Sequence, residues 1–114
     1  MTILLAEDEP SVRGLIVEWL KRSGYSVLVA ANGHEALELA KGHAGEIEAI
    51  VTDFSMPGVS GIELVREIRL MRPNIRAVLM TGYWIHPLPD DVKIEYLNKP
   101  CSATTLLAAI KRAA

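Results

Sequence analysis

The sequence has only one cysteine, no long hydrophobic run and no basic leader, and each of these features limits the class of protein to which it can belong. Cys101 is the only cysteine, which excludes a disulfide within the chain and fits a reducing compartment. No run approaches the length of roughly 20 apolar residues that a membrane-spanning helix needs. The first apolar run, Ile3 to Ala6, is too short for a signal peptide and no basic residues precede it. We therefore expect a cytoplasmic protein with no membrane segment.

A strong charge of either sign is also missing, since 12 Lys and Arg residues stand against 14 Asp and Glu residues. The basic residues are scattered, so nothing indicates a direct nucleic acid partner or an anionic membrane surface. His34, His43 and His86 show no ligand spacing and are expected at the surface, which disfavours a zinc site. With half of its residues hydrophobic and no repeat or linker, the chain suits one domain over residues 1–114.

Strand and helix patterns alternate along the chain. Short apolar runs predict strands over residues 3–6, 25–30, 48–52, 76–80 and 93–98. Capping residues and helical apolar spacing predict helices beginning at Pro10 and after Asn32, Ser60 and Ser102. Residues 83–91 contain two prolines and no helical period, so the fourth helix is expected to be short or irregular. This alternation predicts an α/β fold, a parallel sheet with helices on both faces.

The third predicted strand ends in a carboxylate, Asp53, and is followed by a turn. Pro57 and Gly58 suit the central positions of a type II turn, because Pro fixes φ and Gly tolerates positive φ. Right-handed crossovers place the carboxyl ends of parallel strands at one edge, where open α/β sheets bind ligands. Asp53 is therefore either a simple cap for the turn or part of a site, and the other strand ends bear on the choice.

Polar residues also follow the first, fourth and fifth strands, namely Glu7 and Asp8, Thr81, and Lys99. A helix cap, a β-former or a solvated charge would explain each alone, but their joint placement at one edge favours a site. Three carboxylates about 4 Å apart would repel by roughly 4 kcal/mol per pair. Lys99 and a divalent cation such as Mg²⁺ would balance them. With the Thr81 hydroxyl, and with Gly82 leaving room, they would cradle a phosphoryl group beside a nucleophilic Asp53.

These residues together resemble the receiver domain of two-component response regulators, over essentially the whole chain. The matching motifs are Glu7-Asp8, Asp53 with Met56-Pro57-Gly58 and Gly61, Thr81-Gly82, and Lys99-Pro100. The resemblance implies a flavodoxin-like, doubly wound five-stranded parallel sheet of order 2-1-3-4-5. It also implies a cis bond between Lys99 and Pro100, which a residue before proline tolerates at low cost.

The resemblance also implies a role for each residue of the site. Asp53 would be the phosphoacceptor. Asp8, Asp53 and the Ser55 backbone carbonyl would bind Mg²⁺ directly, with Glu7 helping through water. Thr81 and Lys99 would hold the phosphoryl oxygens. Tyr96 falls at the position of the family's switch aromatic, although a strand aromatic packed at the sheet edge explains it equally well.

The function implied is that of a phosphorelay switch, not of an enzyme with its own substrate. A phosphohistidine on a histidine kinase or a histidine phosphotransfer protein would donate to Asp53. Thr81 would then move toward the phosphoryl group and Tyr96 would pack inward, which changes the output face. The domain would promote its own phosphorylation and dephosphorylation, and we expect a monomer or a weak dimer.

Two departures from the family pattern and three other functions need consideration. Cys101 replaces the usual Phe, which predicts a gap near the site but no reactive thiol. The irregular stretch 83–91 puts the family's usual output face in doubt.

An aspartate-nucleophile phosphatase needs a second acid where Ser55 stands, and a nucleotide or flavin module needs a Gly-rich loop that the first strand lacks. A receiver-like interaction module that is not phosphorylated stays open.

Overall fold

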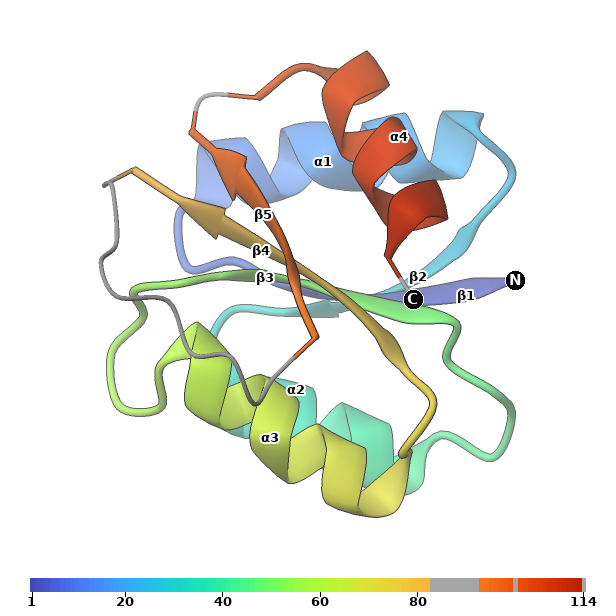
Figure 1. The fold of residues 1–114 in the computed structure, drawn as a ribbon, viewed down its shortest axis with the longest axis vertical. Helices are drawn as coiled ribbons and strands as arrows, with labels where there is room; N and C mark the ends of the chain where they lie inside the picture. The colour runs from blue at the N-terminus through green and yellow to red at the C-terminus, as the bar shows by residue number, and fades with distance from the viewer. Residues whose placement is uncertain (83–92, 100, 114) are drawn as a thin grey trace.

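The computed structural model describes residues 1–82, 93–99 and 101–113, and within them the chain folds as alternating strands and helices (Figure 1). The elements are β1 (Thr2–Ala6), α1 (Pro10–Arg22), β2 (Ser26–Ala30), α2 (Gly33–Gly42), β3 (Ala49–Asp53), α3 (Gly61–Met71), β4 (Arg76–Thr81), β5 (Glu95–Asn98) and α4 (Ala103–Arg112). The strands pair in parallel in the order β2-β1-β3-β4-β5. The predicted α/β fold and its strand order are confirmed.

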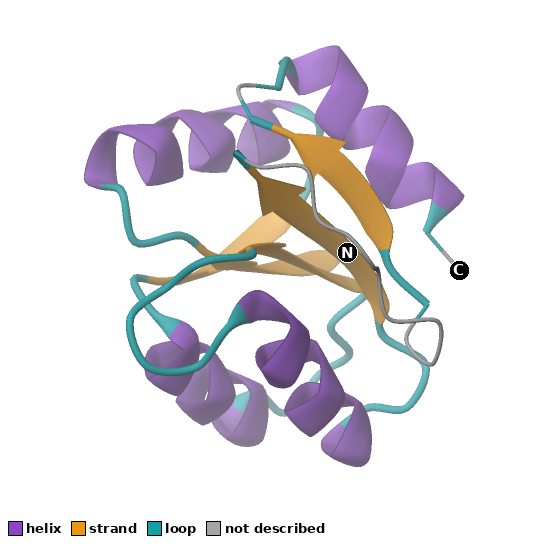
Figure 2. Cartoon of the chain, turned by 60° about the vertical axis from the view of Figure 1, so that its left-hand side comes forward, coloured by secondary structure: helices purple, strands orange, loops and turns teal. Residues whose placement is uncertain are grey.

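The sheet is covered on both faces, by α2 and α3 on one and by α1 and α4 on the other (Figures 1 and 2). Successive side chains of a strand point to opposite faces, so Leu4 packs with the α2 and α3 side while Ile3 packs with the α1 and α4 side. This burial on both faces explains why the strands appear in the sequence as continuous apolar runs. Among the described helices, none combines the length and apolar character that crossing a bilayer requires.

The predicted helix starts are confirmed, and local side-chain chemistry accounts for them. Pro10 is the first residue of α1, where its missing N–H matters least. The side chains of three N-cap residues accept hydrogen bonds from backbone N–H groups three residues on, namely Asn32, Ser60 and Ser102. Gly24 and Gly58 have positive φ, at +92° and +85°, as expected for a helix terminator and a type II turn.

Two strands run one residue further than predicted, and the site residues are their last members. Asp53 ends β3 and Thr81 ends β4. The hydrogen bonding even continues past both, since the Phe54 N–H donates to Met80 O at 2.7 Å and the Lys99 N–H donates to Thr81 O at 2.8 Å. Both side chains are therefore held by strand backbone. The predicted irregular helix over 83–91 and the Lys99–Pro100 bond fall on residues outside the described part of the chain.

Candidate functional site

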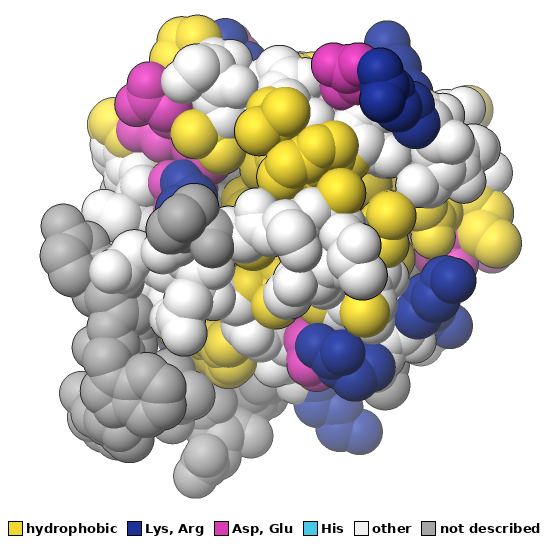
Figure 3. Space-filling view, turned by 90° about the horizontal axis from the view of Figure 1, so that it is seen from above, with side chains coloured by type: hydrophobic (Ala, Val, Ile, Leu, Met, Phe, Trp, Pro, Cys, Tyr) yellow, Lys and Arg dark blue, Asp and Glu magenta, His cyan; other side chains and the backbone are white. Residues whose placement is uncertain are grey.

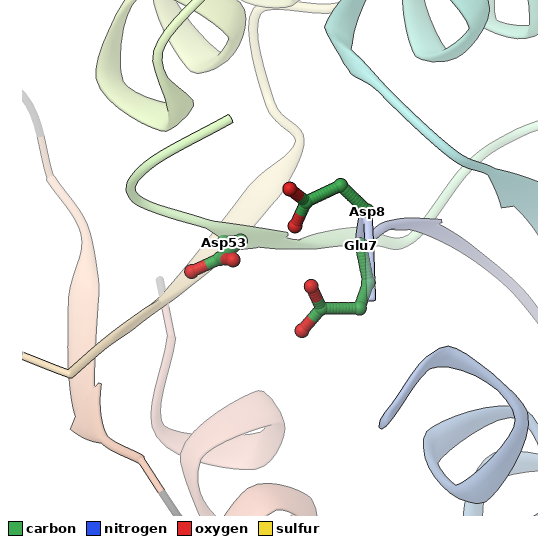
Figure 4. Close-up of side chains that lie close together, drawn as sticks. All are labelled: Glu7, Asp8 and Asp53. Carbon is green, nitrogen blue, oxygen red and sulfur yellow. The ribbon is translucent and has the colours of Figure 1, made fainter. Parts of the chain in front are cut away.

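Three carboxylates meet at the carboxyl edge of the sheet (Figure 4). Glu7 and Asp8 directly follow β1, and Asp53 ends β3 on the neighbouring strand. One carboxylate oxygen from each residue lies within 4.8 Å of those of the other two. Glu7 is 0% exposed and Asp53 is 8% exposed, whereas Asp8 lies open to solvent. The structure thus brings together the acids that the sequence placed on separate strands.

Lys99, which follows β5, joins two of these acids. Its Nζ lies 2.6 Å from Glu7 Oε1 and 3.1 Å from Asp53 Oδ2. Burial by itself lowers the pKa of Lys99, but the hydrogen bonds to Glu7 and Asp53 outweigh it and leave the pKa raised. Lys99 therefore stays protonated and balances one of the negative charges. Negative charge remains at the cluster for a cation to balance.

Glu7 is the most deeply buried acid of the cluster, and its ionised form is disfavoured. Burial raises its pKa, the Lys99 hydrogen bond lowers it by less, and the charge of Asp53 raises it further. Glu7 Oε2 also accepts from the Glu9 N–H at 3.2 Å. A divalent cation at this cluster would reverse the balance, because it favours the ionised carboxylate.

Replacing Glu7 with glutamine should stabilise the protein at neutral pH in the absence of divalent cations. The folded state binds the Glu7 proton more tightly than the unfolded chain does. Proton binding at Glu7 therefore stabilises the folded state fully at a pH below the pKa that Glu7 has in the unfolded chain. This stabilisation is lost as the pH rises through the pKa that Glu7 has in the folded protein. Urea unfolding in EDTA across this range should show Glu7→Gln gaining on the wild type as the pH rises. Glu67→Gln, exposed on α3, is the control, and equal changes in both variants would contradict the assignment.

A cleft of about 320 Å³ opens beside the acids. It is lined by Asp53, Phe54, Ser55, Thr81, Gly82 and Lys99. Thr81 is almost fully buried, and the space where a side chain at Gly82 would begin is open. Of the predicted site residues, the cleft therefore gathers Asp53, Ser55, Thr81 and Lys99. It is large enough for a small anion beside a cation.

Tyr96 and Cys101 lie near this edge but outside that lining. Tyr96 is half-buried on β5, where its Cα pairs with that of Leu79. Cys101 borders a separate hollow of about 110 Å³ whose other lining residues are Val12, Leu15, Ile16, Trp19, Met80 and Lys99. The gap predicted from the small side chain of Cys101 is thus present. Burial raises the pKa of its thiol, which keeps it protonated and fits the expectation of an inert cysteine.

Arg13 also contacts the site, through the backbone. Its Nη1 donates to the carbonyl of Glu7 at 3.0 Å, and so fixes the peptide between Glu7 and Asp8. Sequence reasoning does not find Arg13, because its partner is a main-chain oxygen that no side-chain pattern marks.

The whole chain has clear relatives. Residues 3–111 match the family model described as the response regulator receiver domain. The chain is 40% identical over 114 residues to the sensor kinase CckA of Brucella abortus, covering 96% of this chain but only 12% of that kinase. It is 32% identical to sporulation initiation phosphotransferase F of Bacillus subtilis, covering 96% of this chain and 90% of that protein.

Solved structures show the same likeness. The receiver domain of the hybrid histidine kinase CckA is 33% identical, with a TM-score of 0.86 and coverage of 98% of this chain and 97% of that one. The response regulator TrrA of Thermotoga maritima, in complex with Mg²⁺-BeF, is 32% identical, with a TM-score of 0.81 and coverage of 97% and 96%. A Burkholderia pseudomallei response regulator with a phosphorylated aspartic acid is 30% identical, with a TM-score of 0.83 and coverage of 97% and 66%.

Proposed function

Because the chain belongs to the response regulator receiver domain family, we propose that it accepts a phosphoryl group on Asp53 from a phosphohistidine of a histidine kinase or phosphotransfer protein. One observation carries the proposal: the Asp53 carboxylate ends a buried strand, pairs with Lys99 at 3.1 Å and faces a cleft that Thr81 also lines. The phosphorylated aspartic acid in the Burkholderia neighbour supports this assignment.

The residues of the site fit Mg²⁺. Carboxylate and carbonyl oxygens are the ligands that this ion prefers, and three acids with only one lysine leave negative charge to balance. In the proposal Asp8, Asp53 and the Ser55 carbonyl hold the ion directly, and Glu7 acts through water. When bound, the cation neutralises charge on the transferring phosphoryl oxygens. The Mg²⁺-BeF complex of the Thermotoga neighbour supports the choice of metal.

In the proposed step, an oxygen of the Asp53 carboxylate forms a bond to phosphorus while the bond from phosphorus to the imidazole nitrogen breaks. The electron pair of that bond stays on the nitrogen, and the imidazole takes up a proton. Lys99 Nζ, already 3.1 Å from Asp53 Oδ2, and the Thr81 hydroxyl then hold the phosphoryl oxygens. The added negative charge biases a small switch in which Thr81 moves toward the phosphoryl group and Tyr96 packs inward.

The proposal is for a switch that promotes its own phosphorylation and dephosphorylation, in the cytoplasm. Incubation with a small phosphodonor and Mg²⁺ tests it. The intact mass should increase by one phosphoryl group, and EDTA should prevent the gain. A wild-type protein that gains no mass from the phosphodonor or from a phosphohistidine donor would favour the unphosphorylated interaction module instead.

Replacing Asp8 with asparagine should abolish Mg²⁺-dependent phosphorylation and leave the fold intact. Asp8 is exposed at the edge of the cluster, so its loss removes a charged metal ligand without opening the core. Isothermal titration with Mg²⁺ and the phosphorylation assay measure the effect, with circular dichroism as the check on folding. An Asp8→Asn protein that is phosphorylated at the normal rate would contradict the metal assignment.

The side of the molecule formed by α1 and α4 is a suitable place for the phosphohistidine donor to dock. Hydrophobic side chains gather in the middle of this face (Figure 3). Leu15, on α1, is 49% exposed. Leu15 and Lys99 line the same small hollow, so a protein held on Leu15 would lie next to the cleft. An exposed apolar patch next to the cleft of the phosphoacceptor favours a protein as the phosphoryl donor over a small molecule.

Replacing Leu15 with aspartate should slow transfer from the phosphohistidine donor by about ten-fold or more, as expected for a buried contact at an interface. Phosphorylation by a small phosphodonor should be unchanged, since Leu15 does not line the cleft. Leu70→Asp is the matched control, because Leu70 is 85% exposed at the far end of α3. Equal transfer rates for both variants would place the docking surface elsewhere.

A further inference from the structure

One buried polar residue lies outside both the acidic cluster and the lining of the cleft. Among the described residues, the buried polar or charged side chains are those of Glu7, Asp53, Thr81 and Thr52. The first three belong to the acidic cluster or line the cleft. Thr52 is 0% exposed, directly precedes Asp53 on β3, and its side chain points to the opposite face of the sheet. It therefore cannot touch a phosphoryl group bound to Asp53.

Thr52 instead contacts the backbone of the phosphoacceptor. Its hydroxyl donates a hydrogen bond to the carbonyl oxygen of Asp53 at 3.0 Å. The same oxygen lies against Gly61, where an added Cβ would come within 2.3 Å of it. The peptide between Asp53 and Phe54 is thus held by a donor and closely approached by the start of α3. Its orientation determines where the chain leaves β3.

The residues that follow are also tied down by backbone hydrogen bonds. The Phe54 N–H donates to Met80 O at 2.7 Å, and the Gly61 N–H donates to Phe54 O at 2.9 Å. Ser55, whose carbonyl is a proposed Mg²⁺ ligand, comes next in the chain and lines the cleft. Any tilt of the peptide after Asp53 would move both the Asp53 carboxylate and the Ser55 carbonyl.

From these contacts we propose that Thr52 is a positioning residue, whose hydroxyl fixes the peptide after Asp53 so that two metal ligands meet the ion together. The inference rests on the proposed function, because it names a support for that same site. Groups that orient metal ligands without touching the metal commonly change metal affinity when they are removed. Thr52 would act in this way through the main chain, on the side of the sheet away from the metal.

Thr52→Val and Thr52→Ser separate the hydroxyl from the shape of the side chain. Valine keeps the volume and suits a buried strand, but it cannot donate to the Asp53 carbonyl. Serine keeps the donor and loses one methyl group. Thr104→Val, at an exposed position of α4, is the control for the chemical change alone. Thr52→Ala replaces the valine variant should that one not fold.

The readouts are the Mg²⁺ dissociation constant from calorimetry, the phosphorylation rate with a small phosphodonor, and the free energy of unfolding in EDTA. Thr52→Val should bind Mg²⁺ about ten-fold more weakly than the wild type, while Thr52→Ser and Thr104→Val stay close to it. A merely structural role predicts altered stability with unchanged Mg²⁺ affinity in the folded protein, and that result would overturn the inference. The inference would also be overturned if Thr52→Ser bound Mg²⁺ as weakly as Thr52→Val.

The two proposals fail in different ways. If the wild type gains no phosphoryl group from either donor, the proposed function fails, and the Mg²⁺ affinities of the Thr52 variants still decide the positioning role. If the wild type is phosphorylated and Thr52→Val matches it in both affinity and rate, the positioning role fails alone.

Discussion

Replacing Asp53 with asparagine should eliminate the mass gain of the protein on incubation with a phosphodonor and Mg²⁺. Asparagine has nearly the same size but an amide in place of the carboxylate, so it offers no anionic oxygen to attack phosphorus. The loss should be complete within the detection limit of intact-mass spectrometry, because Asp53 is the one carboxylate among the described residues that line the cleft. The fold should survive, since an asparagine side chain can still accept a hydrogen bond from Lys99 Nζ.

The same variant should also be more stable than the wild type when metal is absent. Asp53 is almost fully buried and lies within 4.8 Å of two other carboxylates, so removing its charge relieves repulsion that Lys99 only partly offsets. Urea unfolding in EDTA measures this gain, and added Mg²⁺ should stabilise the wild type more than the variant. A phosphorylated Asp53→Asn protein would show that another side chain, such as the exposed Asp8, is the acceptor.

The convergence of the site could be predicted from the sequence because topology determines it. Glu7, Asp53, Thr81 and Lys99 are far apart along the chain, but each stands at the carboxyl end of a strand. In a parallel sheet with right-handed crossovers all such ends lie at one edge. Only the strand assignments had to be correct, and these follow from apolar runs that a sheet covered on both faces requires.

The particular contacts within the site could not be predicted in the same way. No pattern in the sequence shows that Lys99 lies closer to Glu7 than to Asp53, because a flexible side chain chooses its partner by geometry at the scale of an ångström. The contacts of Arg13 and Thr52 could not be predicted for a different reason: both side chains donate hydrogen bonds to backbone carbonyls, which no side-chain pattern marks. Tyr96 lies on β5, and its part in the switch stays a prediction.

Gly61 shows how closely the fold and the site depend on each other. It is the first residue of α3, next to the N-cap Ser60, and the sequence marks it only as part of the family motif. In the structure, an added Cβ would lie 2.3 Å from the Asp53 carbonyl oxygen and 2.9 Å from Leu79 Cδ1. The leucine could move, but the carbonyl belongs to the strand backbone that also carries the phosphoacceptor.

Replacing Gly61 with alanine should therefore destabilise the protein by about 3 kcal/mol, at the upper end of what overpacking costs. Gly14→Ala is the matched control. Gly14 is exposed inside α1, a Cβ there would meet no atom within 4 Å, and alanine should stabilise the helix by about 1 kcal/mol. Urea unfolding in EDTA measures both. The folded fraction of Gly61→Ala should also bind Mg²⁺ more weakly, because α3 can only make room by displacing the peptide after Asp53. Equal stabilities for the two alanine variants would mean that this peptide adapts freely, and the rigid support that we assign to Asp53 would then be wrong.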